Sequence, residues 1–141
     1  MTTQPSTEIT VTRPWHWGIA ILVATDGDVP DVDPDVLVSA GRSGAVICVR
    51  HAQDGVPSFD DEWEWATATV HLALLDEMRP SIHEVVADIV LTTVEGRFSL
   101  GDADEDVVVP THEGRTRVLV EVSDSGDLSP DEVWIDLVPA E

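Results

Sequence analysis

The sequence contains no lysine, asparagine or tyrosine, and only one cysteine, Cys48. A single cysteine cannot form an internal disulfide, which fits a reducing compartment such as the cytoplasm. AT-rich codons encode the three missing residue types, so a GC-rich genome explains their absence. It does not explain why arginine, which GC-rich codons supply, is also scarce. Seven arginines and five histidines are all the basic side chains of the chain.

Long hydrophobic runs are also missing. The longest apolar run, residues 18–24, is far too short to span a bilayer. Residues 1–14 lack the basic segment and following apolar segment of a secretory signal. We therefore expect a cytoplasmic protein that does not bind membranes, with frayed residues 1–6.

Acidic residues are abundant. The 141 residues include 28 aspartates and glutamates, which give a formal net charge of −21. Such a charge argues against unaided binding to nucleic acid or to an anionic membrane, because both would repel the protein. It favours a basic protein partner or a high-salt interior. A simpler interpretation is that the acidity only keeps the protein soluble.

The apolar pattern predicts an all-β protein. Hydrophobic residues make up 43% of a chain whose length suits one domain, residues 1–141. Short segments of alternating apolar residues are separated by glycine, proline and aspartate turn signals. This pattern indicates a single antiparallel β-sandwich of about seven to eight strands, with at most one or two short helices.

Three segments carry more specific expectations. Residues 15–24 are apolar on both faces, which predicts a central strand with Trp15 and Trp17 on the same face. Residues 33–41 predict a short helix or a turn. In residues 62–75 the apolar face changes parity, as it does at a β-bulge or in a strand whose ends are buried on opposite sides.

Residues 81–93 allow two interpretations. A helical stripe is supported by Ser81 and Glu84, which resemble a capping box. The same residues also fit one face of a strand, and we favour a strand from about residue 84 onward. Glu95 and Gly96 then predict the turn of a β-hairpin.

The stretch DGDVPDVDPD, Asp26–Asp35, contains five carboxylates and no basic residue. A calcium loop of the EF-hand type needs glycine at its sixth position and glutamate at its twelfth. Counted from Asp26, these positions hold Asp31 and Leu37, and a start at Asp31 fits no better. The remaining interpretations are an irregular calcium site, a solvated turn, or carboxylates that face a basic partner.

A second acidic cluster, residues 59–65, alternates carboxylates with aromatic side chains. This mixture is typical of a binding hot spot for a cationic surface, although tryptophans in such a chain are more often core residues. The two clusters together give the candidate partner-binding residues Asp26, Asp28, Asp31, Asp33, Asp35, Asp60, Asp61, Glu62, Trp63 and Glu64.

Catalytic and metal-binding motifs are absent from the sequence. It contains no HExxH, CxxC, GxSxG, P-loop or GxGxxG pattern, and its histidines lack paired zinc spacing. Cys48 lies between apolar neighbours in a predicted strand, which suits a small core residue better than a nucleophile. We therefore expect no enzymatic activity, no bound metal and no cofactor.

The order of elements resembles a known family. A strand, an acidic loop, a short helix and the strand GAVICVRH are followed by DIVLTTVEGRFSL and VVVPTHEGRTRVLVEV. From about Trp17 to Val122 this order is similar to the competence-protein J type of bacterial nuclease inhibitor. The resemblance lies in strands and turns, so no functional residue is carried over. It implies a small cytoplasmic protein that binds and silences a DNA-cutting nuclease.

The charge and the resemblance lead to one hypothesis and two alternatives. The hypothesis is a non-enzymatic acidic binding protein, an inhibitor or immunity-type partner of a basic protein such as a nuclease or toxin. The first alternative is a β-sandwich that binds a small ligand or calcium. The second is a housekeeping domain whose acidity reflects solubility or a high-salt interior.

Overall fold

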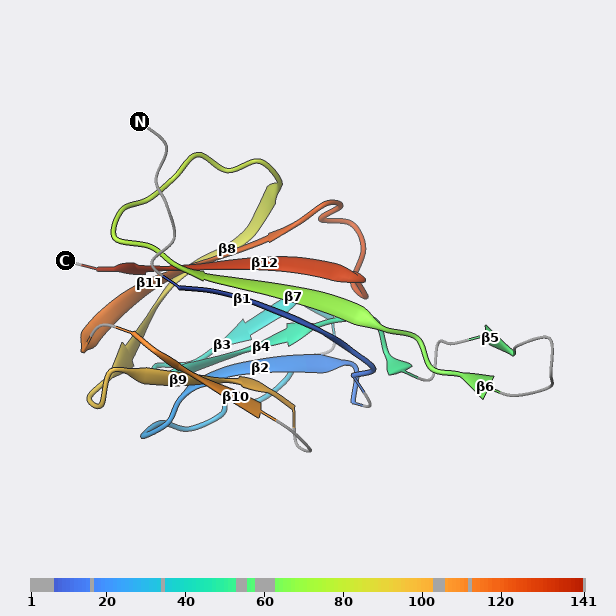
Figure 1. Cartoon of the computed structure of the whole chain (residues 1–141), viewed down its shortest axis with the longest axis horizontal. Helices are drawn as coiled ribbons and strands as arrows, with labels where there is room; N and C mark the ends of the chain where they lie inside the picture. Colours follow the sequence, from blue (N-terminus) through green and yellow to red (C-terminus); the bar gives the residue numbers. More distant parts are fainter. Residues whose placement is uncertain are drawn as a thin grey trace.

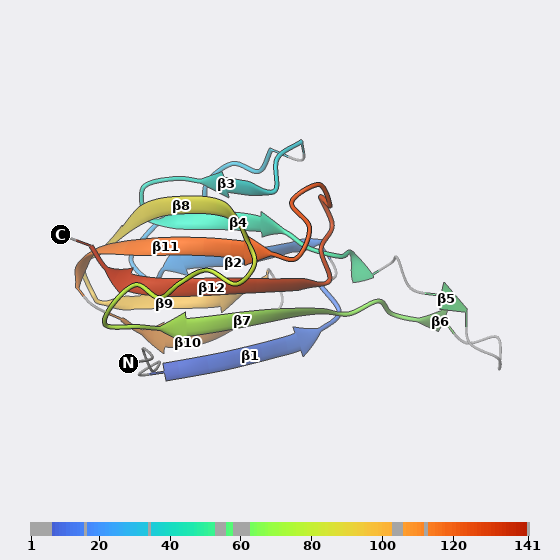
Figure 2. The ribbon, with the colours of Figure 1, turned by 90° about the horizontal axis from the view of Figure 1, so that it is seen from above.

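Two five-stranded β-sheets face each other in the computed structural model (Figures 1 and 2). The structure describes residues 7–15, 17–33, 35–52, 56–57, 63–102, 106–111 and 113–140. The first sheet has the strand order β1-β7-β12-β11-β8 and the second β10-β9-β2-β4-β3. Strands β5 and β6 form a separate ribbon that projects from one end of the molecule. The bounds are β1 Thr7–Arg13, β2 Ile19–Ala24, β3 Val38–Ala40, β4 Gly44–Cys48, β5 Val56–Pro57, β6 Trp63–Glu64, β7 Ala68–Leu74, β8 Glu84–Thr93, β9 Arg97–Gly101, β10 Asp106–Pro110, β11 Gly114–Val122 and β12 Glu132–Pro139.

The predicted all-β sandwich is confirmed. The described residues contain no α-helix, and the strand pairs are antiparallel except for β7 with β12, which is parallel. The two sheets hold ten strands, more than the seven or eight expected. One of the added strands is β3. A short helix or turn was expected over residues 33–41, but residues 38–40 pair with β4 and only residues 35–37 form a turn.

No helix within the described ranges is long and apolar enough to cross a membrane.

The core lies between the two sheets, and each strand contributes one face to it. Strand β2 is central in its sheet, as the sequence predicted. Its even-numbered side chains are buried and its odd-numbered ones are half-buried on the outer face. The facing sheet supplies the odd-numbered apolar residues of β12 and the even-numbered ones of β11. Examples from the two sheets are Ala20, Leu22, Ala24, Val118, Val120, Val122, Val133, Ile135 and Leu137.

The prediction of a strand from residue 84 is confirmed by β8, and the helical alternative is wrong. The Glu84 carboxylate accepts a hydrogen bond from the Ser125 amide at 2.6 Å instead of capping a helix. The hairpin expected at Glu95 and Gly96 is also wrong, because β8 and β9 belong to different sheets. The turn, where Gly96 has a φ of 72°, carries the chain from one sheet to the other.

The predicted long strand over residues 62–75 is interrupted. Residues 65–67 separate β6, which pairs with β5, from β7, which belongs to the first sheet. The change of apolar face therefore marks a break between two sheets and not a bulge. A register shift of the bulge type occurs instead in β8, opposite Val120 and Glu121.

The start of β2 also differs from expectation. Trp15 is completely buried and donates its indole N–H to the Ala68 carbonyl at 3.0 Å, whereas Trp17 is exposed. Gly18 has a φ of 67° and its amide donates to the Trp15 carbonyl at 2.9 Å. This turn delays the strand to Ile19, so the two tryptophans do not share a face.

Candidate functional site

The acidic loop joins β2 to β3 and is fixed against the β3–β4 hairpin. The amide of Asp28 donates to the Ser43 hydroxyl at 3.1 Å, and that of Asp33 donates to the Ser39 hydroxyl at 3.0 Å. A Cβ on Gly44 would lie 3.1 Å from the Asp28 carbonyl, so the loop approaches β4 closely. These two hydrogen bonds hold the loop through its backbone and use none of its carboxylates.

Asp26 differs from the other aspartates of the loop, because both of its carboxylate oxygens have partners. One oxygen accepts from the Thr93 hydroxyl and the other from the Val94 amide, each at 3.0 Å. The hydrogen bond from the Val94 amide, helped by Thr93, lowers the pKa of Asp26. Asp26 therefore ties the start of the loop to the end of β8.

The remaining aspartates of the loop are exposed. Asp33 accepts the Asp35 amide at 2.9 Å, which forms a local turn. Within the described residues, no hydrogen bond or salt bridge reaches the carboxylates of Asp28, Asp31 and Asp35. These three are the carboxylates of the loop that remain available to a partner.

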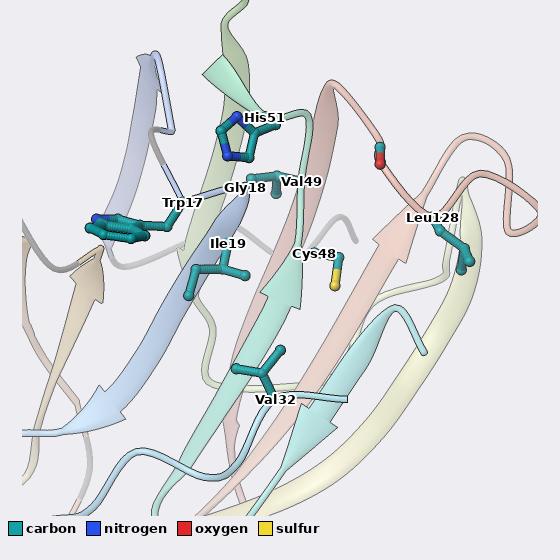
Figure 3. A pocket seen from close by; sticks show the side chains of 9 residues that line it. Trp17, Gly18, Ile19, Val32, Cys48, Val49, His51 and Leu128 are labelled. Carbon is teal, nitrogen blue, oxygen red and sulfur yellow. The ribbon is translucent and has the colours of Figure 1, made fainter. Parts of the chain in front are cut away.

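A hollow of about 300 Å³ lies beside the loop (Figure 3). We call it the anchor pocket. Its wall is built from the turn before β2, the end of β4 and two loops. The lining residues are Trp17, Gly18, Ile19, Val32, Cys48, Val49, His51, Leu128 and Ser129.

The rim of the anchor pocket is apolar but lies in acidic surroundings. Trp17, Val32 and Leu128 are 61%, 44% and 48% exposed. Val32 lies between Asp31 and Asp33 in the chain, and Leu128 follows Asp127, whose carboxylate accepts the Ser129 amide at 2.9 Å. Exposed large apolar side chains gathered around a hollow are typical of a binding surface.

Cys48 is a lining residue of the pocket whose thiol is influenced both by burial and by the acidic loop. Burial raises the pKa of the Cys48 thiol, and the nearby Asp33 carboxylate raises it further. The thiol sulfur lies 3.4 Å from the Val36 carbonyl oxygen and packs against the core. A thiol with a raised pKa stays protonated, which makes it a poor nucleophile and agrees with the packing role expected from the sequence.

The second acidic cluster is only partly described. Asp60, Asp61 and Glu62 lie outside the described residues. Trp63 and Glu64 form β6, whose backbone pairs with β5. The ribbon begins beside the anchor pocket, because the Ala66 amide donates to the carbonyl of Ala52, which follows His51 in the chain, at 2.9 Å.

The tryptophans are less buried than expected. Trp15 is a core residue, but Trp17 and Trp65 are exposed and Trp134 is half-buried. Trp134 stacks between two histidine rings on the outer face of the first sheet, with His83 at 3.6 Å and His71 at 5.5 Å between ring centroids. The expectation that tryptophans belong to the core therefore fails for Trp17 and Trp65.

Arginines offer little internal neutralisation to the acidic loop. Four of the seven pair with carboxylates elsewhere: Arg13 with Asp102, Arg79 with Asp136, Arg97 with Glu95 and Arg117 with Asp88. Across the ranges that the structure describes, no three histidine, cysteine, aspartate or glutamate side chains converge to hold a metal ion. None of these four pairs involves a carboxylate of the acidic loop.

Sequence reasoning found the acidic loop but missed the anchor pocket. Its rim residues come from three segments far apart in the chain, so no local spacing connects them. One signal was present: Val29 and Val32 lie among the aspartates and Val36 directly follows Asp35, and the structure exposes all three valines. Three exposed valines are not expected in a loop whose only requirement is to be solvated.

Two solved structures share this fold. No family model matches the sequence, and no curated protein matches it significantly. ComJ of Bacillus subtilis, an inhibitor of the DNA degrading activity of NucA, has a TM-score of 0.64 at 11% identity, over 99% of this chain and 100% of its own. The crocagin biosynthetic gene J protein has a TM-score of 0.54 at 14% identity, over 95% of this chain and 96% of its own. At these identities the likeness establishes the fold, and it confirms in structure the resemblance to the competence-protein J type.

Proposed function

We propose that this chain is a non-enzymatic acidic binding protein that inhibits a basic protein such as a nuclease. The observation that carries the proposal is the loop Asp26–Asp35, held against the sheet with the carboxylates of Asp28, Asp31 and Asp35 exposed and unpaired among the described residues. The likeness in fold to a nuclease inhibitor supports it. We place the protein in the cytoplasm, where a single free cysteine stays reduced.

The mechanism is electrostatic occupation of a basic surface. A protein that binds DNA neutralises phosphates with lysine and arginine side chains. Carboxylates held on a fixed loop pair with the same side chains and repel incoming DNA. Inhibition of this kind needs no chemical step by the inhibitor. It also weakens with salt, because exposed opposite charges are screened over about 10 Å at 0.1 M ionic strength.

A second candidate function is favoured by one observation, the volume of the anchor pocket. About 300 Å³ lies at the lower end of the range for small-molecule sites, which is roughly 300–1,000 Å³. The pocket combines apolar walls with a few polar groups, as ligand sites do. A small apolar ligand would therefore be the alternative occupant.

The test is a functional assay on a captured partner. The immobilised protein is incubated with native lysate at low salt, and captured proteins are identified by mass spectrometry. We expect a basic nuclease whose cleavage of DNA falls to background as the inhibitor approaches equimolar amounts. The test variant carries the three substitutions Asp28→Asn, Asp31→Asn and Asp35→Asn. A higher concentration of this variant than of the wild-type inhibitor should be needed for the same inhibition of DNA cleavage.

A captured nuclease that cleaves DNA at full rate in saturating inhibitor would contradict the proposal. A set of captured proteins without any basic member would contradict it equally.

A further inference from the structure

We propose that the anchor pocket receives one large apolar side chain of the basic partner, flanked in the partner by arginine or lysine. This inference rests on the proposed function and names the part of the partner that the site recognises. The acidic loop would supply attraction, and the pocket would hold the partner once it is bound.

The rim of the anchor pocket exposes apolar surface to water. Trp17, Val32 and Leu128 stand on the rim of one hollow and remain substantially exposed. Tryptophan is among the residues most enriched in binding hot spots, and hot spots cluster where an anchor fills a pocket and water is excluded. A side chain inserted into this hollow would cover part of the apolar surface that they expose.

The charges around the pocket differ from those of its wall. Among the described residues that line it there is no carboxylate and no arginine. In the chain, Asp31 and Asp33 lie on either side of Val32 and Asp127 precedes Leu128, so three carboxylates flank the lining residues, against one arginine, Arg50, between Val49 and His51. An uncharged ligand gains nothing from such surroundings, whereas an apolar side chain between two basic ones matches both the wall and the rim. Charge complementarity therefore selects a basic protein segment over a small apolar molecule.

Contacts within the protein hold the walls of the anchor pocket in place. The Ser39 and Ser43 hydroxyls and the bonds from Asp26 to β8 fix the loop that carries Val32. On the opposite wall, a Cβ on Gly18 would lie 2.9 Å from the His51 ring, so glycine is required there. A pocket that is already formed does not lose binding free energy to ordering when the partner arrives.

The experiment uses short capped peptides as probes, followed by chemical shifts in two-dimensional NMR of the full chain. The peptides are Arg-Trp-Arg, Arg-Ala-Arg and Glu-Trp-Glu, with N-acetyl-tryptophan amide as the uncharged probe. We expect Arg-Trp-Arg to shift the Trp17 indole signal and the amides of Gly18, Cys48 and Leu128. Its affinity should exceed that of each other probe by about tenfold or more, since both the anchor and the charges contribute.

Variants locate the site. Trp17→Ala and Leu128→Ala should each weaken Arg-Trp-Arg by about fivefold or more, since each removes part of the rim. The matched control is Ile82→Ala, at a side chain that is 87% exposed and does not line the pocket; this variant should bind as the wild type does. Circular dichroism of each variant checks whether it keeps the fold.

Several results would overturn the inference. Equal binding of Arg-Trp-Arg and Arg-Ala-Arg would show that charge alone acts. Binding of N-acetyl-tryptophan amide as tight as that of Arg-Trp-Arg would show a small-molecule site, and unchanged binding by both rim variants would place the peptide elsewhere. No binding of any probe at millimolar concentration would also reject the pocket. The inhibition of DNA cleavage is measured separately, so the pocket can fail while the proposed function holds.

Discussion

At the scale of single residues, the five aspartates of the loop have different roles, although the sequence presents them as equivalent. Asp26 is bound to Thr93 and Val94, and Asp33 closes a local turn with Asp35. These partners are either distant in the chain or depend on loop geometry, so spacing could not separate a structural aspartate from one available to a partner. The sequence identified the acidic cluster but did not show which of its aspartates hold the loop in place and which remain available to a partner.

Asp26→Asn should destabilise the protein in a pH-dependent way. The folded-state pKa of Asp26 lies below its ordinary value of 3.8, so the ionised carboxylate stabilises the fold above that value. This stabilisation is lost as the pH falls through the lowered pKa. We therefore expect a lower Tm for Asp26→Asn than for wild type near neutral pH, and a difference that shrinks below about pH 4.

Asp31→Asn is the control, because it removes the same charge from the same loop but breaks no hydrogen bond among the described residues. Its Tm should equal or slightly exceed that of wild type. Equal melting temperatures for Asp26→Asn and wild type at neutral pH would show that the tether to β8 contributes nothing.

At the scale of elements, period-two alternation identified strands correctly but did not tell which sheet each strand joins. The alternation predicted β2 and β11 as strands, but β2 is apolar on both faces, so the pattern did not show that its even-numbered side chains are the buried ones. The turn after β8 has the glycine of a hairpin, yet β9 pairs with β2 in the other sheet. A turn that reverses the chain within one sheet and a turn that crosses between two carry the same local signal.

The connection from β7 to β8 should depend on Arg79. This side chain donates two hydrogen bonds to Asp136 of β12, at 2.8 and 3.2 Å, and the Asp136 side chain is only 8% exposed. Arg79→Met leaves that carboxylate buried without its partner, which should cost about 1–3 kcal/mol of unfolding free energy. Urea denaturation measures the loss.

Arg117→Met is the matched control, since it removes the same charge. Arg117 pairs with Asp88 through 2.6 and 2.9 Å bonds, but both side chains are more than 40% exposed. Exposed pairs contribute about 0–1 kcal/mol, so this variant should lose less stability than Arg79→Met. Equal losses for the two variants would contradict a special role for the buried carboxylate.

At the scale of the whole molecule, the net charge of −21 on 141 residues has a consequence for stability. Repulsion between like charges opposes the compact state, and salt screens it over about 10 Å at 0.1 M. We expect the Tm to rise from low to moderate sodium chloride. A flat or falling Tm would mean that the carboxylates are already compensated locally.

The loop should not act as a strong calcium site, although its composition suggests one. The Asp26 carboxylate already accepts hydrogen bonds at the end of β8. In addition, the aspartates of the acidic loop do not follow the spacing of an EF-hand loop. Calorimetric titration with calcium should give weak or no heat of binding. A stoichiometric submicromolar site would contradict this expectation and favour the calcium-binding alternative.

The sequence could predict the character of the surface but not its shape. Fold class and acidity follow from composition and alternation. The anchor pocket, in contrast, depends on the fold, which brings Trp17, Val32 and Leu128 from separate segments of the chain to the lining of one pocket. Trp17 was assigned to a buried strand face because alternation continues through Gly18. Only the turn at this glycine, with its positive φ, brings the tryptophan to the surface.

Association kinetics with the captured partner test the central proposal most directly. Opposite charges chiefly raise the association rate, and anchor contacts chiefly slow dissociation. The triple variant Asp28→Asn, Asp31→Asn and Asp35→Asn should associate about tenfold more slowly than wild type at low salt, with the difference shrinking as salt rises. Identical association rates for the two proteins at every salt concentration would mean that the acidic loop is a solvated turn and does not bind the partner.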